Sequence, residues 1–480
     1  MSKKVLLISY HFPPSAEVGG LRIANFASRL PLFGWQPYVL TLKDQYVEKT
    51  DPNRLDRLGE IHIAKAGRLP TLSDAYLWIK RCAQRRLQNS VDFGPQQSPT
   101  LRTSRSAKSE GFVRKFRRYV LSFLTLPDPQ RNWIWPAVLQ AVRLIKREQI
   151  GVILTSCPPY SAHIVGLIVK QLTGTPWIAD FRDPWMATST KSLYCTCVVS
   201  RRIEQWLEQC VIRQADVIIS NTQTLNDSFV DRYRTMAPDR FVCITNGFDG
   251  DVFSKLERVE KEKRFTITYT GTLYFGRTPE PVFHAVQQLI REGSVRPEDI
   301  HIRLVGHCQL IDGRPIEDVI ERYQLRALVE VLQPVSYMKS IELVKHSHLA
   351  LLLAPNQPYQ IPAKVYDYIA AGTRVLALAE EGATWDLIRS TGVGGVFHPT
   401  DVAGIKRMIA SSINDSHHSG NGLDDESKGR FDVTNLTGRL VDQLDRIGAG
   451  VQGANHTSRI AGCPSGKLQQ EAGERELKRR

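Results

Sequence analysis

The chain has 480 residues, more than one hydrophobic core usually serves, so we expect two domains. Hydrophobic residues make up 42% of it, enough for sizeable cores, and no stretch approaches the roughly 18 uninterrupted apolar residues of a membrane span. The net charge of +14 favours anionic partners, but no zinc-finger, recognition-helix or aromatic-interleaved pattern accompanies it, so nucleic acid is not an expected partner.

Strands and helices alternate in the N-terminal half. The first apolar run ends at Pro13 and Pro14 and lacks the small-residue cleavage site of a signal peptide, so it predicts a strand. Short apolar strands that alternate with helices predict a parallel sheet covered on both faces. The predicted strands are 3–12, 36–42, 151–156, 175–181 and 215–222, and the predicted helices are 19–35 and 158–174.

A basic segment interrupts this series at 101–126. Seven Lys and Arg residues stand there against the single acid Glu110, and an apolar run from Tyr119 to Leu124 follows. Basic groups next to apolar ones are typical of an anchor on an anionic membrane surface. A solvated loop that leads into a core helix remains an equal alternative. Residues 86–110, rich in Gln, Ser, Arg and Pro, predict little order.

The strand and helix series restarts after a turn-rich junction at 245–253. Strands are predicted at 264–272, 300–306, 329–335, 348–355 and 393–401, with helices at 278–290, 336–347 and around 361–371. Two α/β series predict two Rossmann-like domains with parallel sheets facing across a cleft. We expect an N-terminal domain over 1–245, a C-terminal domain over 246–430, a helix over 431–447 that packs on either domain, and a disordered tail over 448–480.

Three turns are suited to hold an anion. In parallel α/β sheets, ligands lie beyond the carboxyl ends of the strands, where helix N-termini offer free N–H groups. The first turn has Gly19 and Gly20, and the second has Gly271 followed by Arg277. Each glycine is also explained by ordinary turn chemistry, and neither domain has the G-x-G-x-x-G fingerprint of a dehydrogenase.

The third turn is "IPAKVYDYIAAG", which places Lys364 and Asp367 three residues apart on a predicted helix. Residues at this spacing share one face of a helix. An ammonium neutralises diphosphate oxygens and a carboxylate accepts hydrogen bonds from ribose hydroxyls, so the pair is suited to a nucleotide-diphosphate site. An exposed ion pair without function is the alternative.

Four stretches together resemble glycosyltransferase family 4: "ISYHFPPSAEVGGLRIANFASRLPLFGWQPYVLT", "TSCPPYSAHIVGLIVKQLTGTPWIADFRDPW", "YTGTLYFGR" and "IPAKVYDYIAAGTRVLA". The D-F-R-D-P-W motif is similar to that of the bacterial polysaccharide-type members. The resemblance implies the GT-B fold, an acceptor held mainly by the N-terminal domain and a nucleotide-sugar donor held mainly by the C-terminal one. It also implies retaining transfer, with no cofactor and no essential metal.

The resemblance also implies roles for single residues. Arg277 and Lys364 would hold the donor diphosphate, and Asp367 the ribose. Asp367 stands at the second glutamate of the family's E-x7-E pair, and Tyr359 stands at the first, which leaves the contact to the transferred sugar open. Gly19 and Gly20 resemble the family's glycine loop beside the donor phosphates.

The remaining candidates lie in the N-terminal half. His163 is expected to touch the donor sugar or to be structural. Asp180 and Asp183 are expected either to orient or deprotonate an acceptor hydroxyl or to form a structural network with arginine. Trp133 and Trp135 are expected to pack in the core or to stack on the acceptor.

The sequence therefore predicts a cytoplasmic glycosyltransferase, peripheral on the inner face of the cell membrane. Its partners would be a nucleotide-diphosphate sugar and a saccharide or lipid-linked acceptor. A nucleotide-sugar epimerase of the same fold and a catalytically silent binding partner are the alternatives. Eight cysteines are scattered, and Cys195 and Cys197 lack a second pair at ligand spacing, so reduced thiols are expected and a metal site is not.

Overall fold

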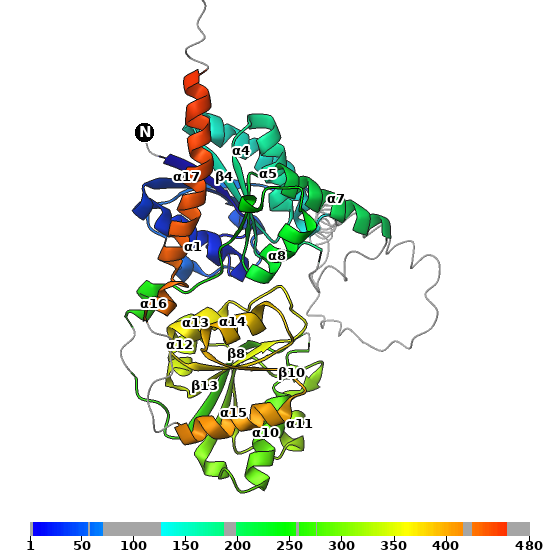
Figure 1. The fold of residues 1–480 in the computed structure, drawn as a ribbon, viewed down its shortest axis with the longest axis vertical. Coiled ribbons are helices and arrows are strands. Elements are labelled where there is room, and N and C mark those ends of the chain that lie inside the picture. Colours follow the sequence, from blue (N-terminus) through cyan, green and yellow to red (C-terminus); the bar gives the residue numbers. More distant parts are fainter. Residues whose placement is uncertain are drawn as a thin grey trace, which may run out of the picture.

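The computed structural model describes residues 3–55, 58–70, 126–186, 198–255, 259–274, 276–415 and 425–457. The expectations for the basic segment up to residue 125, for the low-order region 86–110, for Cys195 and Cys197 and for residues 458–480 therefore lie outside the described residues. The chain forms two α/β domains, one above the other in Figure 1.

The N-terminal domain is built on a sheet of seven parallel strands in the order β3-β2-β1-β4-β5-β6-β7. Almost every residue of β1, β2, β4, β5 and β6 is buried, as expected for a sheet covered on both faces. The strands are β1 (Lys3–Ile8), β2 (Trp35–Leu42), β3 (His62–Ala66), β4 (Val152–Cys157), β5 (Trp177–Phe181), β6 (Val217–Ser220) and β7 (Phe241–Cys243).

Four helices cover one face of this sheet, and their apolar side chains join a single core cluster. They are α4 (Ile134–Glu148), α5 (Ser161–Thr173), α7 (Val198–Gln214) and α8 (Gln223–Arg232). On the opposite face lies α1 (Leu21–Arg29). The helix expected over 19–35 is broken, because a separate 3-10 turn with Pro31 near its start begins at Leu30 and Gly34 ends it in the left-handed conformation.

The C-terminal domain repeats the arrangement with six parallel strands in the order β12-β9-β8-β13-β14-β15. The strands are β8 (Phe265–Thr272), β9 (Ile300–His307), β12 (Val329–Leu332), β13 (Leu349–Ala354), β14 (Arg374–Ala379) and β15 (Gly394–Phe397). The helices are α10 (Glu280–Arg291), α11 (Ile316–Arg322), α12 (Tyr337–His346), α13 (Lys364–Ala370), α14 (Ala383–Thr391) and α15 (Val402–Asp415). A small hairpin joins β10 (Leu310–Ile311) to β11 (Arg314–Pro315).

The chain crosses twice between the domains. It passes downward near α9 (Gly250–Phe253) and returns through α16 (Asp425–Gly429) into α17 (Val433–Thr457), the red helix in Figure 1. The two crossings contact each other, since the backbone N–H of Phe248 donates to the carbonyl of Phe431 at 3.0 Å.

Helix α17 packs on the N-terminal domain, a choice that its sequence left open. Leu440 and Leu444 are fully buried beside Val5 and Leu7 of β1. The helix continues to Thr457, so the expected boundary at 447 and the expected disorder from 448 are corrected for residues 448–457. Burial of one apolar stripe against the sheet accounts for its position.

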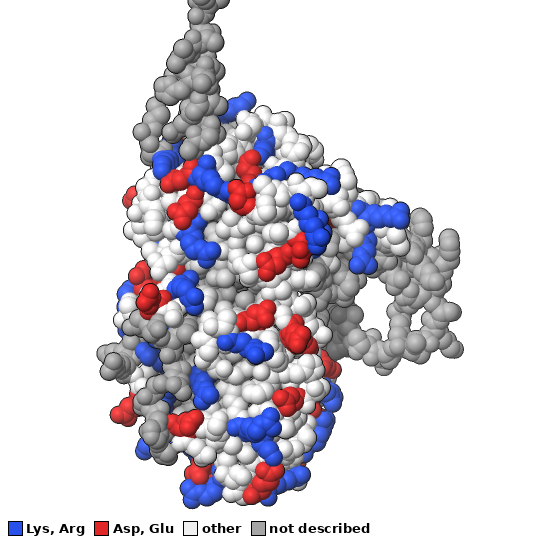
Figure 2. Space-filling model, in the orientation of Figure 1, with Lys and Arg blue, Asp and Glu red and all other residues white. Residues whose placement is uncertain are grey.

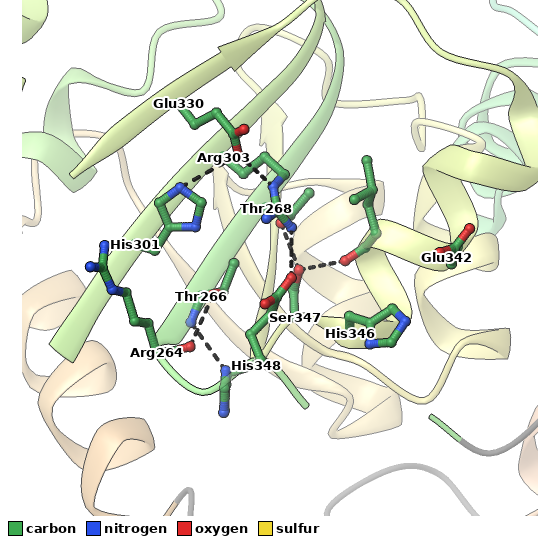
Figure 3. Close-up of polar contacts among 12 residues, drawn as sticks. Arg264, Thr266, Thr268, His301, Arg303, Glu330, Glu342, His346, Ser347 and His348 are labelled. Carbon is green, nitrogen blue, oxygen red and sulfur yellow. Dashed lines mark hydrogen bonds and ion pairs between the residues drawn. The ribbon is translucent and has the colours of Figure 1, made fainter. Parts of the chain in front are cut away.

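A polar network lies within the C-terminal sheet, around the amino-terminal part of β8 (Figure 3). Arg303 donates to Glu330 at 2.9 Å and also pairs with Glu262, while Thr268 and Ser347 share a hydrogen bond of 2.6 Å. Ligands in such folds lie at the carboxyl ends of the strands, so this network belongs to the scaffold.

Candidate functional site

A cavity of about 1150 Å³ lies between the two domains. Its wall is built from the segments that follow strands of both sheets, together with the crossing at Asn246–Asp249. Of the residues proposed from the sequence, Gly19, Asp183, Arg277 and Asp367 line it. Gly20, His163, Asp180, Gly271, Tyr359 and Lys364 are not part of that wall.

Two cations lie close together on the C-terminal side. The ammonium of Lys364, at the start of α13, donates to the carbonyl of Thr270 and lies 4.3 Å from the ring centroid of Tyr269. Burial, and after it the charge of Arg277, lowers the pKa of Lys364 to about 7. Within the described residues neither cation has an acidic partner in salt-bridge range. This part of the site therefore favours an anion.

Arg277 comes from the turn after β8. Its guanidinium lies 4.5 Å from the ring centroid of Tyr274, and its Nε is buried without a hydrogen-bond partner. A buried donor without a partner costs free energy, which an incoming phosphate oxygen would recover. Gly271, near the end of β8, has φ +141°, and a Cβ there would meet the ammonium of Lys364. The positive φ is the reason that a glycine is favoured at this position, since the flexible lysine side chain could move aside.

Asp367 faces the cavity one turn after Lys364 on α13. The hydroxyl of Tyr337 donates to its Oδ1 at 2.8 Å. Burial raises the pKa of Asp367 to about 7, although the bond from Tyr337 and the charge of Lys364 oppose this. The pair therefore differs from an exposed ion pair: both residues are half-buried, and each side chain bonds to its own partner.

Tyr359 does not supply a group to the cavity. Its carbonyl accepts a hydrogen bond from Thr222 Oγ1 of the N-terminal domain at 2.9 Å, and its side chain packs against that domain's core. The next residue, Gln360, lines the cavity and donates to Asp183 Oδ1 at 2.5 Å. The segment before α13 is thus fixed to the N-terminal domain, and Asp183 is engaged across the cleft.

The glycine loop after β1 is held by Arg182. The Nη1 of Arg182 donates to the carbonyl of Gly19 at 2.5 Å, and its other nitrogens donate to carbonyls of Cys157 and Pro158. Gly20 is buried, and a Cβ there would come within 3.0 Å of the backbone of His11 and Phe12. Gly19 therefore reaches the cavity, whereas Gly20 permits close packing beneath it.

Of the two alternatives given for Asp180, its surroundings fit the structural network with arginine and not the catalytic role. It is fully buried, pairs with Arg22 at 2.9 Å and accepts from Ser156 Oγ at 2.7 Å. Arg22 also donates to the carbonyls of Ile244 and Thr245 at the start of the crossing between the domains. A buried carboxylate paired in this way holds α1 to the crossing and is not available to a substrate.

His163 is likewise placed in the core. Its ring is fully buried against Phe181, and its Nδ1 shares a 2.8 Å hydrogen bond with Thr155 Oγ1. Burial lowers its pKa to about 3, so the ring is neutral at physiological pH. Residue 163 lies on the side of α5 that faces the sheet, and its side chain does not line the cavity, which fits the structural alternative given for it.

Sequence reasoning did not single out many polar residues of the wall, among them His11, Asn221, Tyr337 and Gln360. His11 lies in the loop after β1, and burial with the charge of Arg182 lowers its pKa to about 4. Asn221 follows β6, is 4% exposed and has an Oδ1 without a hydrogen-bond partner. His11 and Asn221 lie shortly after a strand, and this position was the sequence signal that could have identified them as wall residues.

The two tryptophans take different positions. Trp133 is fully buried in the core, whereas Trp135 at the start of α4 is 58% exposed and is not part of the cavity wall. In the described ranges no group of three or more His, Cys, Asp or Glu side chains could hold a metal ion. No helix among them is long and apolar enough to cross a membrane.

Comparison with known proteins gives a family match over part of the chain and a fold match over nearly all of it. Residues 95–252 match the model of Glycosyltransferase Family 4. A comparison with curated protein sequences found no match. The solved structures with a similar fold are glycosyltransferases of the GT-B fold and related enzymes, so the chain has the GT-B fold.

Three of these structures illustrate the range of similarity and of enzyme type. HepE from Anabaena, solved with UDP, has a TM-score of 0.59 and 14% identity, covering 92% of this chain and all of its own. A glycosyltransferase from Rickettsia africae has a TM-score of 0.55 and 12% sequence identity, and the match covers 93% of this chain and 99% of the Rickettsia chain. A putative UDP-N-acetylglucosamine 2-epimerase from Listeria monocytogenes has a TM-score of 0.51 and 10% sequence identity, and the match covers 93% of this chain and 96% of the Listeria chain. Identities this low indicate fold alone.

Proposed function

We propose that this protein is a retaining glycosyltransferase that moves a sugar from a nucleotide-diphosphate sugar to a hydroxyl of a saccharide or lipid-linked acceptor in cell-surface polysaccharide synthesis. We place it in the cytoplasm, at the inner face of the membrane. The observation that carries the proposal is the pair of cations Arg277 and Lys364, which form no salt bridge with any described residue, beside a carboxylate that faces the interdomain cavity. The family match and the UDP complex of a protein with the same fold support it.

The donor end of the cavity is suited to the leaving group. As the glycosidic bond loosens toward an oxocarbenium-like state, negative charge grows on the diphosphate. Arg277 and Lys364 would stabilise that charge in a site partly closed to water. Asp367 would accept hydrogen bonds from the ribose once Tyr337 has released it. These steps need no metal or cofactor, and we propose none.

The acceptor end lies on the N-terminal side. Asp183 and Asn221 follow adjacent strands and both line the cavity, offering oxygen atoms that accept hydrogen bonds from hydroxyl groups. In retaining transfer the acceptor would attack from the face of the leaving group, and a diphosphate oxygen would take its proton. With Tyr359 turned to the N-terminal core, its neighbours Gln357 and Gln360 are the polar side chains next to the position of the family's first glutamate that line the cavity.

The test is equilibrium binding of UDP, GDP, ADP and dTDP, measured by calorimetry on the wild type and on Lys364→Met and Asp367→Asn. We expect selective binding of one nucleotide that weakens at least tenfold in both variants. Lys339→Met is the matched control, because Lys339 is exposed on α12 and pairs with Glu342 away from the cavity wall. Lack of binding by folded wild type would overturn the donor site and favour the silent binding partner.

The epimerase remains a second candidate, because a putative epimerase shares the fold. The two activities differ in what they release. A transferase liberates nucleoside diphosphate only when an acceptor hydroxyl is present, whereas an epimerase changes the sugar without any acceptor. Chromatography of the nucleotide products with and without saccharide acceptors would separate them.

A further inference from the structure

The outer face of α4, α5 and α7 exposes an unusual number of large apolar side chains. Trp135 and Trp206 are 58% and 60% exposed, far more than most tryptophans of a soluble domain. We define the α4–α7 face by the six exposed apolar residues of these helices: Trp135, Leu139, Leu172, Val198, Val199 and Trp206. Apolar patches of this kind mark sites of interaction.

The six residues belong to one layer of the fold. Helices α4, α5 and α7 contribute their inner side chains to one core cluster on the same side of the sheet, and α5 contacts both neighbours. Their outer sides therefore point in a common direction. Trp135, in the first turn of α4, closely follows Asp128 and Gln130, which line the cavity, so the start of α4 is the end of this helix that is nearer the cavity.

Basic side chains surround the apolar ones. The exposed cations of these helices are Arg143, Lys146, Arg147, Arg201, Arg202 and Arg213. Figure 2 shows Lys and Arg side chains at the right-hand end of α7, without acidic ones beside them.

The acidic residues of the same helices do not balance these cations. Glu204 and Glu208 of α7 are buried, where they accept from Trp185 and Arg232. Glu148 of α4 is partly buried and bonded to Tyr38 and Arg147. The outward surface of α4, α5 and α7 is therefore apolar and cationic.

We propose that the α4–α7 face docks on an anionic lipid surface. Tryptophan and aliphatic side chains would enter the boundary between headgroups and acyl chains, and the arginines and lysines would lie at the phosphates. A second copy of the chain fits the charge pattern poorly, since it would bring two sets of cations together. Docking here would direct the near end of the cavity to the membrane surface, where lipid-linked hydroxyl acceptors are found. The docking itself does not depend on the proposed function.

The test is flotation of the full-length chain with vesicles of phosphatidylcholine alone and of phosphatidylcholine mixed with phosphatidylglycerol. We expect binding to the mixed vesicles that falls as salt is raised. The double variant Leu139→Ser with Trp206→Ser should lower the vesicle-bound fraction at least tenfold, because both side chains would lose their apolar contact. Each of Arg143→Ser and Arg202→Ser should lower binding about fivefold.

Matched controls lie on the other domain. Leu310 is 55% exposed on the β10–β11 hairpin, and Arg326 is exposed after α11, so Leu310→Ser and Arg326→Ser should bind vesicles like the wild type. Equal binding to both vesicle types, or no binding to either, would overturn the proposal. So would binding that survives in the α4–α7 variants but is lost when the basic residues of 101–118 are replaced. A dimeric wild type that becomes monomeric in the double variant would assign the face to a second copy instead. A thermal unfolding transition like that of the wild type, measured in parallel, keeps a misfolded variant from being counted as support.

Discussion

At the level of a single residue, the protonation state of Lys364 should make diphosphate binding depend on pH. Its ammonium is buried beside Arg277, and its pKa is lowered to about 7. A bound diphosphate would compensate both cations and raise that pKa again, so binding would take up a proton. The charged form that binds the anion is complete below pH 7 and is lost above it.

UDP affinity should therefore fall as pH rises from about 7 to about 9, by up to tenfold per pH unit, in a window above the second phosphate pKa near 6. Calorimetry in two buffers of different ionisation enthalpy measures the affinity and the proton uptake together. Lys364→Met should bind more weakly and show a flatter slope. A wild-type affinity that is constant over this window would contradict the assignment.

Tyr337 governs access to Asp367. Its hydroxyl donates to the carboxylate oxygen that a ribose would use, so the two compete for one acceptor. Tyr337→Phe should tighten UDP binding about two- to tenfold, the usual worth of one hydrogen bond. The same change should raise the pKa of Asp367 further, because the bond from Tyr337 lowers it.

The matched control for that variant is Tyr323→Phe. Tyr323 also donates to a carboxylate, Glu280, but neither residue lines the cavity. Its replacement should leave UDP affinity unchanged. Weaker binding by Tyr337→Phe in titration calorimetry would show instead that the tyrosine holds the nucleotide.

At the level of elements, the buried pair of Asp180 and Arg22 fixes α1 to the crossing between the domains. Asp180→Asn would leave the Arg22 guanidinium buried without its counter-charge. We expect a loss of about 3–5 kcal/mol in unfolding free energy, measured by denaturant titration. The control Asp51→Asn removes a half-exposed partner of Arg54 and should cost no more than about 1 kcal/mol. Full stability with abolished sugar transfer would restore a catalytic role for Asp180.

At the level of the whole molecule, the C-terminal helix completes the N-terminal domain. Leu440 of α17 is fully buried against that domain, although it follows the whole C-terminal domain in the sequence. Leu440→Ala should cost about 2–5 kcal/mol, and the loss should be confined to one domain. Hydrogen exchange should speed up in β1 and stay unchanged in β13.

Asp442→Ser, an exposed change on the same helix, is the control and should leave both strands protected. Equal loss of protection in β1 and β13 would mean that the two domains unfold as one unit.

The sequence by itself determined the α/β class, the two domains and most strands. Burial on both faces leaves a local signature, a short apolar run between helical patterns, which needs no knowledge of distant residues. It also indicated wall residues that follow a strand or begin a helix, such as Gly19, Arg277 and Asp367. Short segments such as β3 and β7 have few residues, and their pattern was too weak to predict them.

Only the tertiary structure decided which side chains meet. Asp180 finds Arg22 158 positions away, Gln360 reaches Asp183 from the other domain, and α17 returns to β1. Two orientations depend on the same packing: His163 turns to the core and Asp367 to the cavity. The physical reason is that periodicity fixes which face of an element is apolar, while the order of strands and the closure of the two domains fix what that face contacts.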